Sequence, residues 1–372
     1  MIRNFITPLI LSAATLHAMP VYIGTNTGGS GDSKGIYRAD FNPETGKLSE
    51  PLLVAEYSNP GFLALHPKKP ILYAVGQPKT AFPDGTGSVA AFSVVDDRPL
   101  EFIGEASVGG KGACHLAVDS TGATVAIANY NDGTISTVKL DENGKPGGIA
   151  TLISNKGSGP DKSRQEGPSA HGVYFDKANK HLFVPDLGLD QVLIYPFDAA
   201  TSKLGAALPS LATAPGAGPR HMAFAPDEKH AYVINELDST VLPASYHEGK
   251  LTALATVPTL PKDFTEKSTT AEIEVHPNGK FVYASNRGHD SIAVFQRNAD
   301  TGALTLIQHA PCGGKTPRHF KIDPSGKWLL CAHQNSNTIS VLGIDTVTGL
   351  LSAPSNTVAA PNPICLLFAP AR

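Results

Sequence analysis

Short apolar segments alternate with polar turns along the whole chain, and the same order of segments recurs seven times. In one copy an apolar segment runs from Arg220 to Phe224, turns at residues 226–229 and returns through residues 231–234 to Glu236. Alternating apolar positions bounded by turn residues predict antiparallel strands. The turns recur about every 46 to 57 residues, which is close to the length of a four-stranded propeller blade. They fall at His66-Pro67, Asp119-Ser120, Asp176-Lys177, Ala225-Pro226, His276-Pro277, Asp323-Pro324 and Ala369-Pro370.

We therefore predict an all-β protein in which residues 19–372 form a single seven-bladed β-propeller with four-stranded antiparallel blades. The final copy stops after its first strand, whereas the β segment at Val21–Ile23 starts as a returning strand without a first strand before it. The two termini should complete one blade between them, because closure removes the exposed edges of the repeat. The predicted first strands are 61–65, 114–118, 171–175, 220–224, 271–275, 318–322 and 364–368.

Connectivity places the start of each first strand and the end of each returning strand on one rim. The first ring position contains Gly61, Cys114, His171, Arg220, Ala271, Arg318 and Ile364. The next contains Phe62, His115, Gly172, His221, Glu272, His319 and Cys365. The returning strands end at Tyr130, Leu187, Glu236, Arg287 and Gln334, preceded by Asn129, Asp186, Asn235, Asn286 and His333.

This rim gathers arginine, histidine and glutamate in a chain with only 17% charged residues. Arginine matches carboxylate or phosphate groups bidentately, and histidine with glutamate supplies acid–base chemistry near neutral pH. The ligand should be an anion. Because neighbouring residues of a strand face opposite ways, His221 and His319 are expected between the blades if Arg220 and Arg318 point into the funnel.

The net charge of −3 gives no global attraction to nucleic acid or to an anionic membrane, so neither is expected as a partner. Residues 1–18 resemble a secretory signal peptide, with Arg3 before an apolar run from Phe5 to Leu16 and a small residue, Ala18, at the end. This predicts a periplasmic or secreted protein. The alternative is a cytoplasmic protein that starts at Met19.

The four cysteines, Cys114, Cys312, Cys331 and Cys365, show no spacing typical of a metal site. We expect buried free thiols, with one disulfide as the alternative in an exported protein. No metal and no cofactor is expected.

Several segments resemble the lactonase family of seven-bladed propellers, which includes bacterial 6-phosphogluconolactonase and the fungal carboxy-cis,cis-muconate lactonizing enzyme. The resemblance extends over roughly residues 19–369. It rests on Tyr22-Ile-Gly-Thr25, residues 157–168, His171-Gly172, Gly218-Pro-Arg-His221, Val233-Ile-Asn-Glu-Leu237 and Ser285-Asn-Arg287. The resemblance implies catalytic roles for His171, Glu236, Arg220 and Arg287. Bacterial relatives often have His-x-His where this chain has Ser169-Ala170-His171, so Ser169 stands in place of the first histidine and cannot transfer a proton in its way.

We hypothesise the hydrolysis of a sugar lactone by a monomer, with a small anionic lactone or carboxylate as the substrate. Glu236 or His171 would activate water, and Arg220 and Arg287 would hold the anionic group and the developing oxyanion. Further substrate contacts are assigned to Arg318, Gln334, Asn286, Asn235, Arg164, His319 and His221. Arg164 belongs to a loop, residues 155–167, that is expected to fold over the funnel. The alternatives are cyclisation of a muconate-like diacid and a non-catalytic binding propeller on the cell surface.

Overall fold

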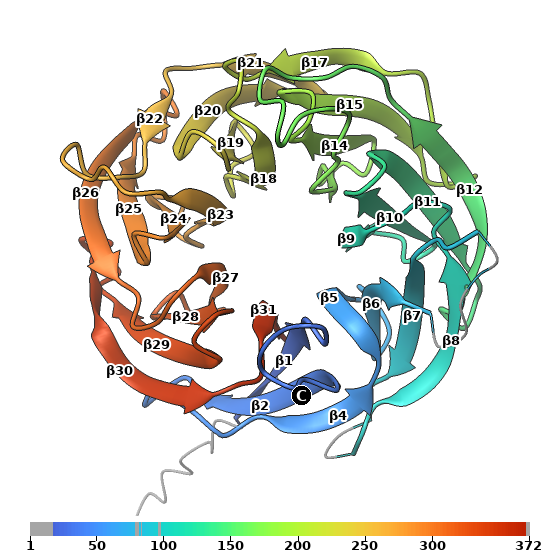
Figure 1. Ribbon diagram of the computed structural model, residues 1–372, viewed down its shortest axis with the longest axis horizontal. Coiled ribbons are helices and arrows are strands. Elements are labelled where there is room, and N and C mark those ends of the chain that lie inside the picture. The colour runs from blue at the N-terminus through green and yellow to red at the C-terminus, as the bar shows by residue number, and fades with distance from the viewer. Residues whose placement is uncertain (1–17, 79–81, 83, 96–97, 370–372) are drawn as a thin grey trace, which may run out of the picture.

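Seven antiparallel sheets are arranged around a common axis in the computed structural model (Figure 1). The structure describes residues 18–78, 82, 84–95 and 98–369, so the expected leader lies outside the described residues except for Ala18. Within these ranges every regular element is a β-strand. They contain no helix that is both long and apolar enough to cross a membrane. The predicted seven-bladed propeller is confirmed.

Each blade is one sheet, numbered here along the chain. Blade 1 contains β31 (Pro363–Phe368), β1 (Met19–Thr25), β2 (Gly35–Asn42), β3 (Lys47–Leu48) and β4 (Leu52–Glu56). Blade 2 contains β5 (Ser58–Leu65), β6 (Ile71–Gln77), β7 (Ser88–Ser93) and β8 (Glu101–Ser107). Blade 3 contains β9 (Ala113–Val118), β10 (Thr124–Asn129), β11 (Thr134–Leu140) and β12 (Pro146–Ser154). Blade 4 contains β13 (Tyr174–Phe175), β14 (His181–Asp186), β15 (Gln191–Asp198), β16 (Lys203–Leu204) and β17 (Leu208–Ala212).

The remaining three blades follow the same order from the axis outward. Blade 5 contains β18 (Pro219–Phe224), β19 (His230–Asn235), β20 (Thr240–His247), β21 (Lys250–Ala253) and β22 (Val257–Pro258). Blade 6 contains β23 (Thr269–Val275), β24 (Phe281–Arg287), β25 (Ser291–Arg297) and β26 (Leu304–Pro311). Blade 7 contains β27 (Pro317–Ile322), β28 (Trp328–His333), β29 (Thr338–Ile344) and β30 (Leu351–Ala359).

The two ends of the chain close blade 1, as the repeat pattern predicted. Strand β1 pairs antiparallel with β31, with Val21 opposite Phe368 and Ile23 opposite Leu366. The N–H group of Ala369 donates a hydrogen bond of 2.9 Å to the carbonyl oxygen of Pro20. This pairing leaves the ring without an open gap between its first and last strands (Figure 1).

The second strand of each blade is buried on both faces because neighbouring blades pack against it from both sides. Strands β10 and β19 have no exposed residue, which explains their continuous apolar sequence. Buried tyrosines on these second strands tie adjacent blades together. Tyr73 and Tyr283 donate hydrogen bonds of 2.7 and 2.8 Å to the carbonyl oxygens of Gly144 and Gly349 in the next blade.

Irregular pairing at the start of the innermost strands shapes the rim. On β18, Pro219 is opposite Asn235 but His221 is opposite Ile234, so two residues on β18 match one on β19. The same shift occurs on β27, between Pro317 and His319. Such bulges re-aim side chains. Arg220 and His221, and likewise Arg318 and His319, therefore all line one central cavity.

The innermost strand of blade 4 is shorter than predicted. We expected a strand over residues 171–175, but β13 contains only Tyr174 and Phe175. Pro185 on the neighbouring strand β14 has no N–H group, so it cannot donate to the ladder at this level. The N–H group of Val173 turns away and donates 3.2 Å to His115 Nδ1. The segment at His171 is thus held by side chains as well as by backbone.

Candidate functional site

A polar cavity of about 780 Å³ opens at the rim predicted to hold the functional residues. The starts of innermost strands and the ends of returning strands meet there, as the connectivity implied. Its lining includes Tyr130, Arg164, His171, Glu236, Arg287 and Arg318. A smaller cavity of about 250 Å³ lies along the innermost strands and shares His171 and Arg318 with it.

Glu236 is the negative centre of this cavity, with a side chain that is only 6% exposed. Its Oε1 atom accepts from Arg164 Nη2 at 2.7 Å, and its Oε2 atom lies 2.9 Å from Arg287 Nη2 and 3.2 Å from Arg220 Nε. Burial alone would raise the pKa of Glu236, but Arg287 and Arg220 together with His171 and Arg164 hold it well below its usual range. Glu236 is therefore a carboxylate across the whole neutral range.

The arginines outnumber the acidic partner that they share. The buried Nε–H groups of Arg220 and Arg287 make no hydrogen bond, and the 3.2 Å approach of Arg220 Nε to Glu236 is an ion pair without hydrogen-bond alignment. Arg318 has no hydrogen bond or ion pair to any described residue, although it lines both cavities. Burial, followed by Arg220 and Arg287, lowers the pKa of Arg318 to about 9. Such a surplus of buried donors fits an anion.

His171 sits beside these arginines as a neutral base. It is buried, and its ring meets that of Tyr130 edge-on with 5.1 Å between the centroids. Its Nδ1 atom lies 3.9 Å from Cys114 Sγ. Burial, and after it Arg220 and His221, lowers the pKa of His171 well below its usual value of 6.5. A neutral imidazole has a lone pair that can accept a proton from water, whereas both carboxylate oxygens of Glu236 are already engaged by arginines.

The loop at residues 155–167 reaches the cavity, as predicted. Arg164 Nη2 contacts both Glu236 and the hydroxyl oxygen of Tyr130, the latter at 3.0 Å. Its neighbour Gln165 is fully buried and donates to the carbonyl oxygen of Leu187 at 2.8 Å and to Asp190 Oδ1 at 2.7 Å. Gln165 therefore anchors the loop and Arg164 presents its charge.

A second layer of side chains lies deeper along the innermost strands. Glu272 Oε2 is 3.0 Å from His221 Nδ1 and 3.3 Å from His319 Nε2. His319 Nδ1 accepts the N–H group of Leu366 at 3.2 Å, which assigns the ring proton to Nε2. Burial lowers the pKa of His319 to about 4. The expectation that His221 and His319 lie between the blades is wrong, because the bulges turn them towards the axis.

Three residues predicted to contact substrate are placed elsewhere. Asn286 Oδ1 accepts a hydrogen bond of 2.7 Å from the Thr259 hydroxyl, and Asn286 Nδ2 donates one of 3.0 Å to the Thr259 carbonyl oxygen. Asn235 Nδ2 donates to Thr240 Oγ1 at 2.9 Å. Asn286 on blade 6 therefore holds the connection that leaves blade 5, whereas Asn235 braces the turn of its own blade. Gln334 is absent from the described lining of the three cavities in this part of the molecule. The position of each residue along its strand predicted the correct rim, but it did not predict the direction in which these three amide side chains point.

The sequence did not point to several polar residues that line the larger, 780 Å³ cavity, among them Lys111, Lys267 and Thr86. They come from connections between strands, which no repeat alignment places in space. Tyr130 was put on the rim, but its hydrogen bond with Arg164 was not foreseen. The two lysines add further positive charge to the mouth of the cavity.

The seven-bladed fold, together with the arginine-rich rim, agrees with one family of propellers. A family model described as "Lactonase, 7-bladed beta-propeller" matches residues 20–368, and the chain belongs to this family.

Individual relatives agree with this assignment. The chain is 35% identical to 6-phosphogluconolactonase of Bacillus subtilis over 93% of its own length and 97% of the relative. It is 36% identical to 6-phosphogluconolactonase of Formosa agariphila, covering 85% and 90% of the two chains. Among solved structures, the periplasmic gluconolactonase PpgL of Pseudomonas aeruginosa superposes with a TM-score of 0.88 at 27% identity, covering 95% of this chain and 99% of the other.

Proposed function

We propose that this protein hydrolyses an anionic sugar lactone, with 6-phosphogluconolactone as the first candidate. The observation on which the proposal rests most is Arg318, a half-buried guanidinium without a partner among the described residues, which lines the cavity together with Arg220. A ring-opening hydrolysis forms an oxyanion from a carbonyl group and yields a carboxylate. Preorganised cationic donors stabilise both.

The two acid–base candidates have separate roles in this proposal. His171 accepts a proton from the water that attacks the lactone carbonyl, because its imidazole is neutral. Glu236 keeps three arginine side chains in position. Without this carboxylate the mutual repulsion of Arg164, Arg220 and Arg287 would spread them apart. Glu236 is thus a positioning residue.

The charge of the cavity favours a phosphorylated or carboxylated lactone over a neutral one. Four arginines and two lysines line or border it, against the single carboxylate of Glu236. Two named relatives are 6-phosphogluconolactonases, whereas the Pseudomonas relative is named a periplasmic gluconolactonase. Export of this chain would favour an unphosphorylated substrate, so the location of the protein and its substrate have to be determined together.

The decisive experiment compares the chain from Met19 on glucono-lactone, its 6-phosphate and muconolactones. We expect the highest kcat/KM on the phosphorylated lactone, and at least a tenfold decrease in Glu236→Gln and Arg287→Ala. Arg38→Ala is the matched control, since Arg38 pairs with Asp40 on β2 and does not line the cavity. Equal rates in the wild type and both site variants would overturn the proposal.

Cell fractionation and sequencing of the mature N-terminus decide the location. A periplasmic chain that begins near Met19 and prefers the neutral lactone would replace the phosphorylated substrate with an unphosphorylated one. An intact N-terminus in the cytoplasm would support the phosphorylated lactone.

A further inference from the structure

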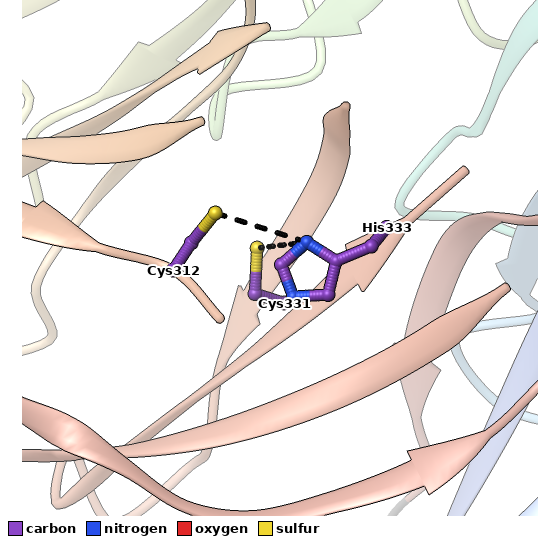
Figure 2. A group of neighbouring side chains, drawn as sticks. All are labelled: Cys312, Cys331 and His333. Carbon is purple, nitrogen blue, oxygen red and sulfur yellow. Dashed lines mark hydrogen bonds between the residues drawn. The ribbon is translucent and has the colours of Figure 1, made fainter. Parts of the chain in front are cut away.

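Two cysteines and a histidine converge in the interior at the boundary between blades 6 and 7 (Figure 2). Cys312 directly follows β26, whereas Cys331 and His333 lie two residues apart on β28 and so face the same side of that strand. All three residues are buried, and their Sγ and nitrogen ligand atoms lie within 4.8 Å of one another. This group is separate from the arginine-rich cavity, and the proposed hydrolysis does not use it.

The hydrogen bonds of His333 turn a free lone pair towards the two sulfur atoms. The Ser340 hydroxyl donates its one proton to the carbonyl oxygen of Cys312 at 2.6 Å, so it accepts from His333 Nε2–H at 2.9 Å. The ring proton therefore resides on Nε2. His333 Nδ1 is left as an acceptor, 3.8 Å from Cys312 Sγ and 4.0 Å from Cys331 Sγ.

These distances are long for hydrogen bonds but suit a metal centre. In a tetrahedral zinc site with ordinary bond lengths, a sulfur and a nitrogen ligand lie about 3.6 Å apart. The Ser340 contact is the kind of outer interaction that fixes the ring of a ligating histidine. Gly314 packs so closely that an added Cβ atom would lie 2.4 Å from His333 Cγ. The imidazole is therefore confined in its position.

We propose that Cys312, Cys331 and His333 form a structural zinc site that joins blade 6 to blade 7. Each thiol loses its proton to solvent as a Zn–S bond forms, while His333 binds through its free Nδ1 lone pair. Two thiolates and Zn²⁺ sum to zero charge, which suits a fully buried position. The carbonyl oxygens of Asp290 and Gly314 lie 2.9 and 3.5 Å from Cys312 Sγ, and either could supply the fourth ligand of the zinc ion.

The test uses the complete propeller from Met19, reduced and freed of metal, with Co²⁺ as a spectroscopic probe and Zn²⁺ as the ligand. We expect one equivalent of either ion per chain, a near-ultraviolet thiolate–cobalt band, and a rise of the melting temperature with zinc. Cys312→Ala and Cys331→Ala should lose the band and the zinc-dependent rise. Cys365→Ala is the matched control, because Cys365 is equally buried but does not belong to the cluster.

Each other outcome contradicts the proposal. Wild-type protein that shows no cobalt band and retains no zinc after equilibrium dialysis would overturn it. So would equal metal binding by Cys312→Ala and the Cys365→Ala control. Peptide mapping that finds Cys312 and Cys331 joined in a disulfide in the purified protein would replace the metal with a covalent link between the same blades.

Discussion

Two buried carboxylates near the axis of the ring have opposite surroundings. Glu236 is shared by Arg164, Arg220 and Arg287, and Arg318 nearby has no partner among the described residues. Glu272 interacts with His221 and His319 through Oε2 and accepts the N–H group of Ile273 at 3.0 Å through Oε1. The group around Glu236, called the upper layer here, has more arginine N–H donors than the protein can satisfy. The group around Glu272, called the lower layer, has its carboxylate oxygens paired with neutral donors.

This difference separates a binding site from its support. Unsatisfied buried donors cost free energy unless a ligand completes them, so the surplus around Glu236 is best explained by an anion. The neutral histidines around Glu272 hold the innermost strands in place beneath it. Adjacent positions of the same strands, Arg220 beside His221 and Arg318 beside His319, supply both layers.

Replacing His171 should have the largest effect on the upper layer. His171→Asn keeps a polar side chain but removes the proton acceptor, and kcat should fall roughly 100- to 10,000-fold with little change in KM. Steady-state kinetics on the preferred lactone measure this. A variant that keeps more than a tenth of the wild-type kcat would move the role of base to another group.

Replacing Arg318 should discriminate between charged and neutral substrates. Arg318→Met preserves much of the side-chain volume but removes the unpaired cation, so kcat/KM should fall roughly 10- to 100-fold on a phosphorylated lactone, as expected for the loss of a charge-assisted hydrogen bond. On glucono-lactone the decrease should be less than about threefold. Equal losses on both substrates would show that Arg318 acts on the common lactone ring.

Changing Glu272 should alter stability more than activity. Glu272→Gln keeps one acceptor oxygen but places an amide NH₂ group where a histidine donates, which should lower the free energy of unfolding by roughly 1–3 kcal/mol. Urea denaturation measures this, and kcat/KM should stay within about threefold of the wild type. A hundredfold decrease in kcat/KM at unchanged stability would show that Glu272 takes part in the reaction.

The smallest effect is expected from pH near neutrality. The pKa of His171 is lowered, so the base is deprotonated at neutral pH and kcat/KM should decline only well below 6.5. The pKa of Glu236 is lowered from its unfolded value of 4.5, so its stabilisation is complete above that value and is lost as the pH falls through the folded pKa. A rate profile with a midpoint at or above 6.5 would contradict the neutral-imidazole assignment.

The blades and the common rim followed from the sequence because each depends on patterns that repeat. Turn spacing gave the seven copies, and connectivity alone placed His171, Glu236 and Arg287 at one cavity. The pairing of Val21 with Phe368 followed from the incomplete first and last copies.

Side-chain directions did not follow, because local irregularities control them. Strict alternation failed at His221, where a bulge adds one residue to the strand. It failed at His171 for another reason, the missing N–H group of Pro185 on the neighbouring strand. Cys312 and Cys331 escaped notice as a pair because they lie in different blades, nineteen residues apart in sequence, and only the packing of the blades brings them together.

The pairing of β1 with β31 also determines when the ring can form. Strand β1 begins at Met19 and its partner begins at Pro363, so almost the whole chain is made between them. At about 5–20 residues per second, synthesis of that interval takes roughly 20 to 70 seconds. Throughout this time β1 has an unpaired edge that is open to other strands. Completion of the ring is therefore a step that has to wait for the synthesis of β31.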